Sequence, residues 1–216
     1  MVERSGAGIA KLLLEAGAVT FRPDEPFRFN SGLLSPMFID SSILVSKPAE
    51  RKEIAQALEA LLVARYRRFD VIAAKAADGI PWGAWVSARF NVPLVYVYER
   101  SKRYGQRNQI EGVLPLDART VVVTDLVAAG DSAAGIVGAL RRAGSTPLGV
   151  IAIYTYGMDY ANQALQKAGV PCHALTDLQT LVDVAERQGR LTAKSHEKVL
   201  RWAADPTGWG KMMGFE

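Results

Sequence analysis

The sequence predicts an α/β protein with a doubly wound parallel core sheet flanked by helices. Short apolar runs rich in valine and isoleucine occupy residues 71–74, 94–97, 121–123 and 148–153. Uninterrupted runs of this kind are typical of strands buried on both faces of a parallel sheet. Helical patterns lie between them, at residues 82–90, 132–143 and 160–168. Strands that alternate with helices place a ligand at the carboxyl ends of the strands.

The segment before residue 70 is expected to contain helices and one extended stretch. Apolar residues recur at helical spacing over residues 9–16, and Gly17 is a suitable helix end. The alternation over residues 27–30 is typical of a strand. Ser46 as a cap and Pro48 in the first turn then predict the start of a long amphipathic helix.

The composition limits the class of protein. A chain of 216 residues, 49% hydrophobic and 22% charged, suffices for one globular α/β domain. The net charge of +4 comes without a zinc-finger spacing or a basic zipper, so we expect no nucleic-acid partner. No apolar run approaches the roughly 20 residues of a membrane helix, so we expect no membrane partner and a cytoplasmic location. The single Cys172 excludes an internal disulfide.

A strand, an acid and a turn of small residues follow one another at residues 121–134. The residues expected to form a site here are Thr124, Asp125, Ala128, Ala129, Gly130, Asp131 and Ser132. Outward-facing amides and a helix N-terminus, capped by Asp131 or Ser132, can hold a phosphate. Asp125 can accept hydrogen bonds from sugar hydroxyls. An ordinary strand-to-helix connection with a capping aspartate fits this stretch equally well.

A polar, basic segment follows the apolar run at 94–97. Between Tyr98 and Gln109, four cations accompany one acid, Glu99. Cations that close over an anionic leaving group stabilise its developing charge. The alternative is a solvated loop without a role in chemistry.

A third segment, residues 27–40, combines tight turns with aromatic residues. Ser-Gly and Ser-Pro pairs mark a structured turn. Phe27, Phe29 and Phe38 can cover a planar ring, or they can fill a core.

In their shared order and spacing, these segments resemble the orotate phosphoribosyltransferase family from about Gly17 to the C-terminal tail. The supporting stretches are Ser31-Gly32, Ser35-Pro36, Gly79-Ile80-Pro81, Arg103-Tyr104-Gly105, Asn108 to Gly112 and Thr124 to Ser132. The resemblance implies a type I phosphoribosyltransferase fold working as a homodimer. It implies one domain over 1–216, with a small N-terminal hood from 1–45, the core sheet and helices in 70–180, and a helical tail in 190–216.

The resemblance also implies a reaction in pyrimidine nucleotide biosynthesis. The phosphoribosyl group of phosphoribosyl diphosphate passes to orotate, giving orotidine 5'-phosphate and pyrophosphate. Mg²⁺ is expected to arrive on the substrate diphosphate, with no direct protein ligand. Asp125 is expected to hold the ribose hydroxyls, and the amides of residues 128–132 the 5'-phosphate. Lys102 and Arg100, in a basic loop that reaches the neighbouring subunit's site, are expected to stabilise the departing pyrophosphate. The other positions expected to contact substrate are Tyr98, Tyr104, Ser31 and Phe38.

Several positions depart from the family pattern. Acidic, hydroxyl and basic residues are replaced at Thr124, Ala128, Ala129, Tyr98 and Tyr104. Asp78 adds a negative charge just before Gly-Ile-Pro, near the expected pyrophosphate. Two alternatives therefore stand beside an active orotate phosphoribosyltransferase. One is a non-catalytic homologue that senses phosphoribosyl diphosphate or a nucleotide, and the other is a phosphoribosyltransferase for another base.

Overall fold

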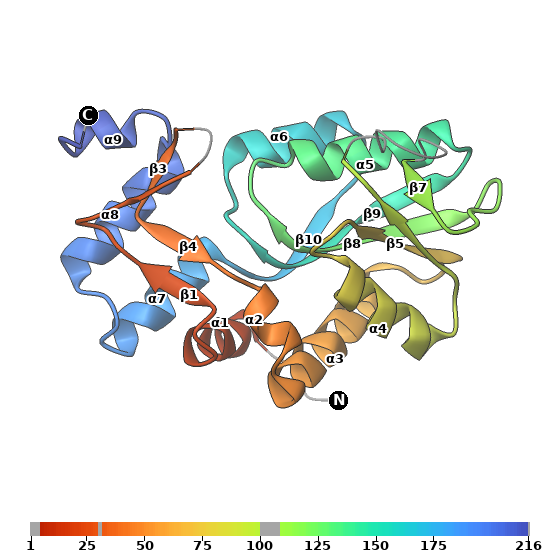
Figure 1. Ribbon diagram of the computed structural model, residues 1–216, viewed down its shortest axis with the longest axis horizontal. Helices are drawn as coiled ribbons and strands as arrows, with labels where there is room; N and C mark the ends of the chain where they lie inside the picture. Colours follow the sequence, from red (N-terminus) through yellow and green to blue (C-terminus); the bar gives the residue numbers. More distant parts are fainter. Residues whose placement is uncertain (1–4, 30–31, 100–108, 216) are drawn as a thin grey trace. The chain divides into compact units, whose positions relative to one another are not determined.

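The computed structural model describes residues 5–29, 32–99 and 109–215, which form two compact units. Unit 1 consists of Arg51–Leu175, and unit 2 joins the beginning and the end of the chain, from 5–50 and from 176–215 (Figure 1). The expected division into a hood, a core and a tail within one domain stays a prediction.

Unit 1 is built on a six-stranded sheet in the order β10-β9-β8-β5-β6-β7. The strands are β5 (Val71–Lys75), β6 (Leu94–Val97), β7 (Ile110–Glu111), β8 (Arg119–Val127), β9 (Thr146–Thr155) and β10 (Cys172–Asp177). Strand β5 pairs in parallel with β6 and β8, and β8 pairs in parallel with β9. Among the described pairings of this sheet, the one between the short β7 and β6 is antiparallel. The parallel core that the valine-rich runs predict is confirmed.

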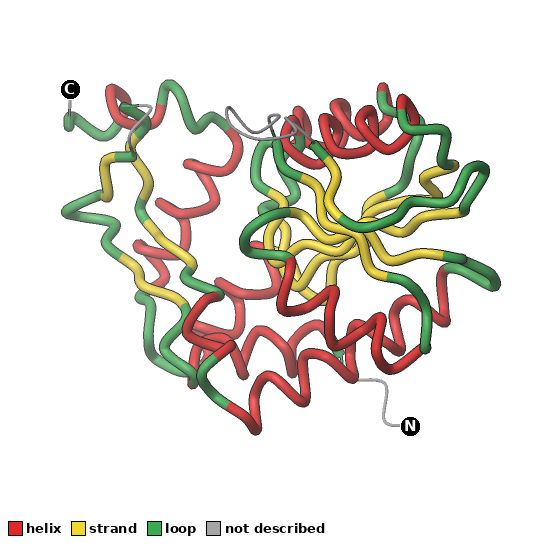
Figure 2. Tube along the Cα trace, turned by 45° about the vertical axis from the view of Figure 1, so that its right-hand side comes forward, coloured by secondary structure: helices red, strands yellow, loops and turns green. Residues whose placement is uncertain are grey.

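Helices cover both faces of this sheet, as a doubly wound fold requires. Helices α5 (Asp131–Arg142) and α6 (Asp159–Lys167) lie on one face, and α3 (Pro48–Arg65) and α4 (Ile80–Phe90) lie on the other (Figures 1 and 2). The side chains of Val122, Val150 and Ile136 are fully buried between β8, β9 and α5. Burial of each such side chain is worth about 1.5–3 kcal/mol, so the apolar runs hold the layers together.

Strand β8 extends farther than its apolar run predicts. The run ends at residue 123, but the ladder continues with Thr124 opposite Ala152 and Leu126 opposite Tyr154. Asp125 therefore lies within β8 and not at its end, which corrects the expected position. The polar side chains of Thr124 and Asp125 interrupt the apolar run, so the run does not indicate that the strand continues. Polar residues can still pair in a sheet, because ladder hydrogen bonds use the backbone and not the side chains.

Unit 2 combines small antiparallel pairs with helices from both ends of the chain. Strand β1 (Val19–Phe21) pairs with β4 (Met37–Ile39), and β2 (Phe27–Arg28) pairs with β3 (Leu34–Ser35). The helices are α1 (Gly6–Glu15), α2 (Ser42–Val45), α7 (Leu178–Arg187), α8 (Ala193–Ala204) and α9 (Trp209–Met212). Gly17, at a φ of 77°, follows the end of α1 as the sequence predicts.

Hydrogen bonds within unit 2 connect residues that are far apart in the sequence. The indole Nε1 of Trp202, only 2% exposed, donates to the carbonyl of Leu34 at 2.8 Å. Arg190 Nη1 donates to the carbonyl of Leu14 at 3.0 Å. These contacts bind the C-terminal helices to the N-terminal segment. Within the described ranges, no helix has the length and apolar character needed to cross a membrane.

Candidate active site

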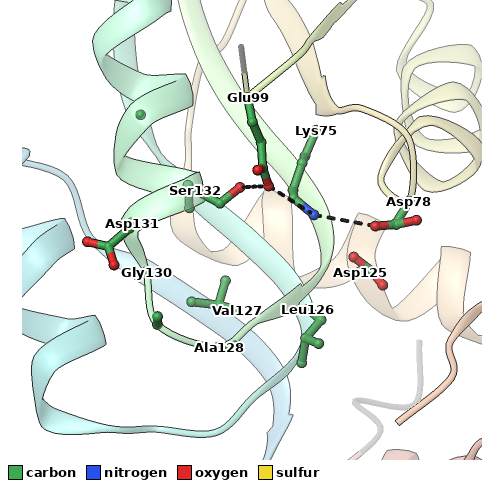
Figure 3. Close-up of a pocket in the computed structure, with 13 residues that line it drawn as sticks. Lys75, Asp78, Glu99, Asp125, Leu126, Val127, Ala128, Gly130, Asp131 and Ser132 are labelled. Atoms are coloured by element: carbon green, nitrogen blue, oxygen red, sulfur yellow. Dashed lines mark hydrogen bonds and ion pairs between the residues drawn. The ribbon is translucent and has the colours of Figure 1, made fainter. Parts of the chain in front are cut away.

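A cavity of about 540 Å³ opens at the carboxyl ends of the central strands of unit 1 (Figure 3). Residues 125–133, from the end of β8 through the start of α5, form much of its wall. Lys75 comes from the end of β5, Asp78 from the loop that follows it, and Glu99 from the segment after β6. The cavity therefore lies at the edge of the sheet where the alternation of strands and helices places a ligand.

Gly130 is the N-cap of α5, at a φ of 82°, and no side chain caps this helix. The expected cap by Asp131 or Ser132 is wrong: Asp131 is the first helical residue, and the Ser132 hydroxyl donates to Glu99 instead. The amide of Ala134 donates to the carbonyl of Gly130 at 2.9 Å. The earlier amides of the helix have no intrahelical acceptor, so this end of α5 is suited to bind an anion.

Gly130 is required here by its backbone and by its neighbour. A Cβ at this position would lie 2.7 Å from the carbonyl oxygen and 2.9 Å from the Cα of Ala161 in α6. We expect Gly130→Ala to lower the free energy of unfolding by about 2–4 kcal/mol, because a positive φ and a backbone clash both oppose the new methyl group. Urea unfolding measures this change.

Gly135, also in α5, gives the matched control. A Cβ there would have no atom within 4 Å, so Gly135→Ala should keep or raise stability, by up to about 1 kcal/mol. Equal urea midpoints for the two variants would show that close packing of α6 against the turn does not select glycine at position 130.

Asp125 lines the cavity with a carboxylate that its neighbour helps to orient. Its side chain is partly reachable, with the residue 8% exposed, whereas Thr124 is fully buried and does not line the cavity. The hydroxyl of Thr124 lies 3.2 Å from Asp125 Oδ1, to which it donates, and 3.4 Å from the carbonyl of Leu126. Any role of Thr124 in binding substrate would therefore act through the Asp125 carboxylate.

A chain of polar contacts crosses the cavity from α5 to the loop after β5 (Figure 3). Ser132 Oγ donates to Glu99 Oε1, and the same oxygen lies 3.8 Å from Lys75 Nζ. Lys75 Nζ also lies 3.4 Å from Asp78 Oδ2. The negative charge of Asp78 is thus offset by a lysine that the sequence analysis missed. Its one local signal was its place at the carboxyl end of an apolar strand.

The loop that carries Asp78 packs closely against β8. A Cβ at Gly79 would lie 2.6 Å from the carbonyl oxygen of Val123 and 2.8 Å from that of Lys75. Only glycine allows the loop to approach the strand this closely. The approach places Asp78 and the end of β5 beside the turn of β8 and α5.

Two titrating groups of unit 1 are held in their neutral forms. Burial, and to a smaller extent the charge of Asp131, raises the pKa of the Tyr160 phenol in α6. Burial also raises the pKa of the Cys172 thiol to about 11. A thiol with so high a pKa is a poor nucleophile at neutral pH, so Cys172 is a packing residue.

Tyr98 does not line the cavity. Its amide donates to the carbonyl of Gln109 at 2.9 Å, and its ring meets that of Tyr96 edge to face, with 5.9 Å between centroids. The backbone hydrogen bond of Tyr98 therefore joins the residue that follows β6 to the residue that precedes β7.

Phe38 belongs to β4 in unit 2 and is 43% exposed. Its ring centroid lies 5.8 Å from that of Phe27 and 6.3 Å from that of Phe29. The expected aromatic group therefore exists within unit 2, and its contact with a planar ligand stays a prediction. The remaining expected site residues, Arg100, Lys102, Tyr104 and Ser31, lie outside the described residues.

Curated relatives match the chain over nearly its full length. The orotate phosphoribosyltransferase of Halalkalibacterium halodurans is 41% identical over 199 residues, which cover 92% of this chain and 95% of that protein. The Bacillus caldolyticus enzyme of the same name is 41% identical over 202 residues, covering 94% and 98%. The Coxiella burnetii enzyme is 39% identical over 201 residues, covering 93% and 96%. No protein-family model matches the chain.

Solved structures agree with these relatives. The structure of Leishmania donovani UMP synthase matches with a TM-score of 0.77 at 27% identity, covering 93% of this chain and 42% of that one. Orotate phosphoribosyltransferase from Aeropyrum pernix matches with a TM-score of 0.72 at 28% identity, covering 85% of this chain and 99% of that one. The type I phosphoribosyltransferase fold is confirmed, and with about 40% identity over almost the whole length, the chain belongs to the orotate phosphoribosyltransferase family.

Proposed function

We propose that this protein transfers the phosphoribosyl group of phosphoribosyl diphosphate to orotate, giving orotidine 5'-phosphate and pyrophosphate. Membership of the orotate phosphoribosyltransferase family supports this reaction. The structural observation that supports it best is one cavity lined by both the Asp125 carboxylate and the small-residue turn at the start of α5. A sugar phosphate needs both features, one for its hydroxyls and one for its phosphate.

Asp125 is proposed to accept hydrogen bonds from the ribose hydroxyls. As the bond between C1' and the diphosphate oxygen breaks and the bond from the orotate nitrogen forms, the ribose gains positive charge. A carboxylate fixed beside it stabilises that charge, because a nearly buried group is less screened than one in water. The amides of residues 128–132 are proposed to bind the 5'-phosphate at the positive end of the α5 dipole.

The departing pyrophosphate requires cations. Among the described residues that line the cavity, Lys75 is the one that carries a positive charge. The resemblance adds Lys102 and Arg100, which we propose to reach the site of the neighbouring subunit in a homodimer. Positive groups close to the leaving oxygens stabilise the charge that develops there.

The cavity walls fit Mg²⁺ that arrives with the diphosphate. The described residues contain no group of three or more side chains arranged to hold a metal. Asp78, Glu99, Asp125 and Asp131 are nevertheless among the residues that line the cavity. Mg²⁺ is commonly bound by one or two carboxylates together with substrate phosphates, and it neutralises part of the diphosphate charge. We propose that the protein acts on this magnesium complex in the cytoplasm.

A non-catalytic sensor of phosphoribosyl diphosphate is the second candidate. The contact between Ser132 and Glu99 favours it, because a serine of the phosphate-binding turn is engaged by a carboxylate of the protein itself. Ala128 and Ala129 also leave that turn with amides and without side-chain donors.

Assay of orotidine 5'-phosphate formation with purified protein and magnesium separates these functions. We expect turnover. Binding of phosphoribosyl diphosphate in a calorimeter without turnover would support the sensor. Absence of both would indicate a phosphoribosyltransferase for another base or another phosphosugar.

A further inference from the structure

Glu99 engages two groups that lie where a phosphorylated ligand is proposed to bind. Its Oε1 accepts the hydrogen bond of the Ser132 hydroxyl, in the first turn of α5. The same oxygen lies 3.8 Å from the ammonium of Lys75, at the end of β5. Figure 3 shows the Glu99 carboxylate between these two side chains. One carboxylate oxygen therefore contacts both a hydroxyl donor and a cation, as a phosphate oxygen would.

The charges around the cavity make the contact of Glu99 with Ser132 and Lys75 unfavourable for the binding of an anion. Lys75 is the cation among the described lining residues, and it is paired with both Glu99 and Asp78. An incoming anion thus meets a lysine whose charge is already neutralised. It cannot share the single Ser132 proton with a carboxylate, and two anions on one oxygen site repel each other.

We infer that Glu99 is a built-in competitor for the phosphoanion of the substrate. A ligand that takes up Ser132 and Lys75 must displace the Glu99 carboxylate, so the free energy of that contact is subtracted from the free energy of binding. When the binding-competent arrangement is only a fraction of the population, the apparent dissociation constant rises by the inverse of that fraction. The inference rests on the proposed function, because it takes phosphoribosyl diphosphate as the ligand.

Glu99 can be displaced without unfolding the unit. Its side chain is 55% exposed, so a rotation moves the carboxylate into water. Lys75 keeps Asp78 as a partner 3.4 Å away and remains at the end of β5. The contact can compete with a ligand, because a charge-assisted hydrogen bond is stronger than a neutral one, and it can be broken, because an exposed ion pair contributes little to stability.

The test measures binding of magnesium–phosphoribosyl diphosphate by calorimetry, without orotate, in wild type, Glu99→Ala, Ser132→Ala and the double variant. We expect Glu99→Ala to lower the dissociation constant about three- to tenfold. In the Ser132→Ala background the gain should shrink to about twofold or less, because the hydroxyl for which Glu99 competes is gone.

Asp78→Ala is the matched control, since it removes a carboxylate from the same cavity and the same lysine without a contact to Ser132. Its effect on binding should be the same with and without the Ser132 hydroxyl. Glu99→Gln provides a second variant that keeps the side-chain length.

Three results would overturn the inference. If wild type binds and Glu99→Ala binds equally or more weakly, the competitor role is wrong while the proposed function stands. If the gain persists unchanged in Ser132→Ala, Glu99 acts only through its charge on the cavity. If no variant binds the ligand, the competitor role and the proposed phosphate subsite fall together.

Discussion

Replacing Asp125 with asparagine is expected to lower kcat/KM for orotidine 5'-phosphate formation by about 10²- to 10³-fold. The carboxylate lies within β8, is 8% exposed and accepts a hydrogen bond from Thr124, so its position is fixed before substrate binds. Asparagine keeps the shape and loses the negative charge that we propose to stabilise the ribose as it becomes cationic. The loss should appear mainly in kcat, measured at saturating orotate and phosphoribosyl diphosphate.

A control is needed because Asp125 is nearly buried and its replacement also perturbs stability. Asp117→Asn changes the same charge in unit 1 at an exposed turn outside the cavity, and asparagine tolerates its φ of 57°. We expect Asp117→Asn to retain wild-type kinetics. If folded Asp125→Asn retained more than about half of wild-type kcat, the proposed electrostatic role of this carboxylate would be wrong.

The strands of unit 1 were predictable because burial on both faces demands apolar side chains in a continuous run. The four runs became β5, β6, β8 and β9. The end of β8 was not predictable in this way, because the backbone pairing of Thr124 and Leu126 with β9 has no local sequence signal. For the same reason the sequence does not indicate the hydrogen bond from the Trp202 indole to the carbonyl of Leu34.

The candidate site likewise has one part that the sequence predicts and one part that it does not. Its turn was predictable because an acid, small residues and a helix start follow one another in the sequence. The contacts among the side chains were not, since Glu99 is 33 residues from Ser132. Ser132 looks like a helix cap when its neighbours alone are considered, and only the fold shows that its hydroxyl is directed to Glu99. Lys75 escaped notice because its role depends on the loop that brings Asp78 to it.

Lys102→Ala is expected to reduce kcat by about 10²-fold or more, because Lys102 is proposed to stabilise the pyrophosphate as it leaves. In the proposed homodimer, each site combines Asp125 of one subunit with Lys102 of the other. A heterodimer of Lys102→Ala with Asp125→Asn would then have both lesions in one site and none in the second. We expect such a heterodimer to recover about half of the wild-type activity per dimer, although each variant alone is nearly inactive.

Co-expression of the two variants with different affinity tags, followed by two successive purifications, isolates this heterodimer for assay. If instead each subunit used its own Lys102, every site in the heterodimer would keep one lesion. The activity of the heterodimer would then stay at the level of the single variants. A heterodimer of Lys102→Ala with wild type gives the reference, since one intact site remains in either arrangement. Recovery in the first heterodimer to about the activity of this reference therefore requires that the two residues act from different subunits, because no contribution within one chain can complete a site from two defective copies.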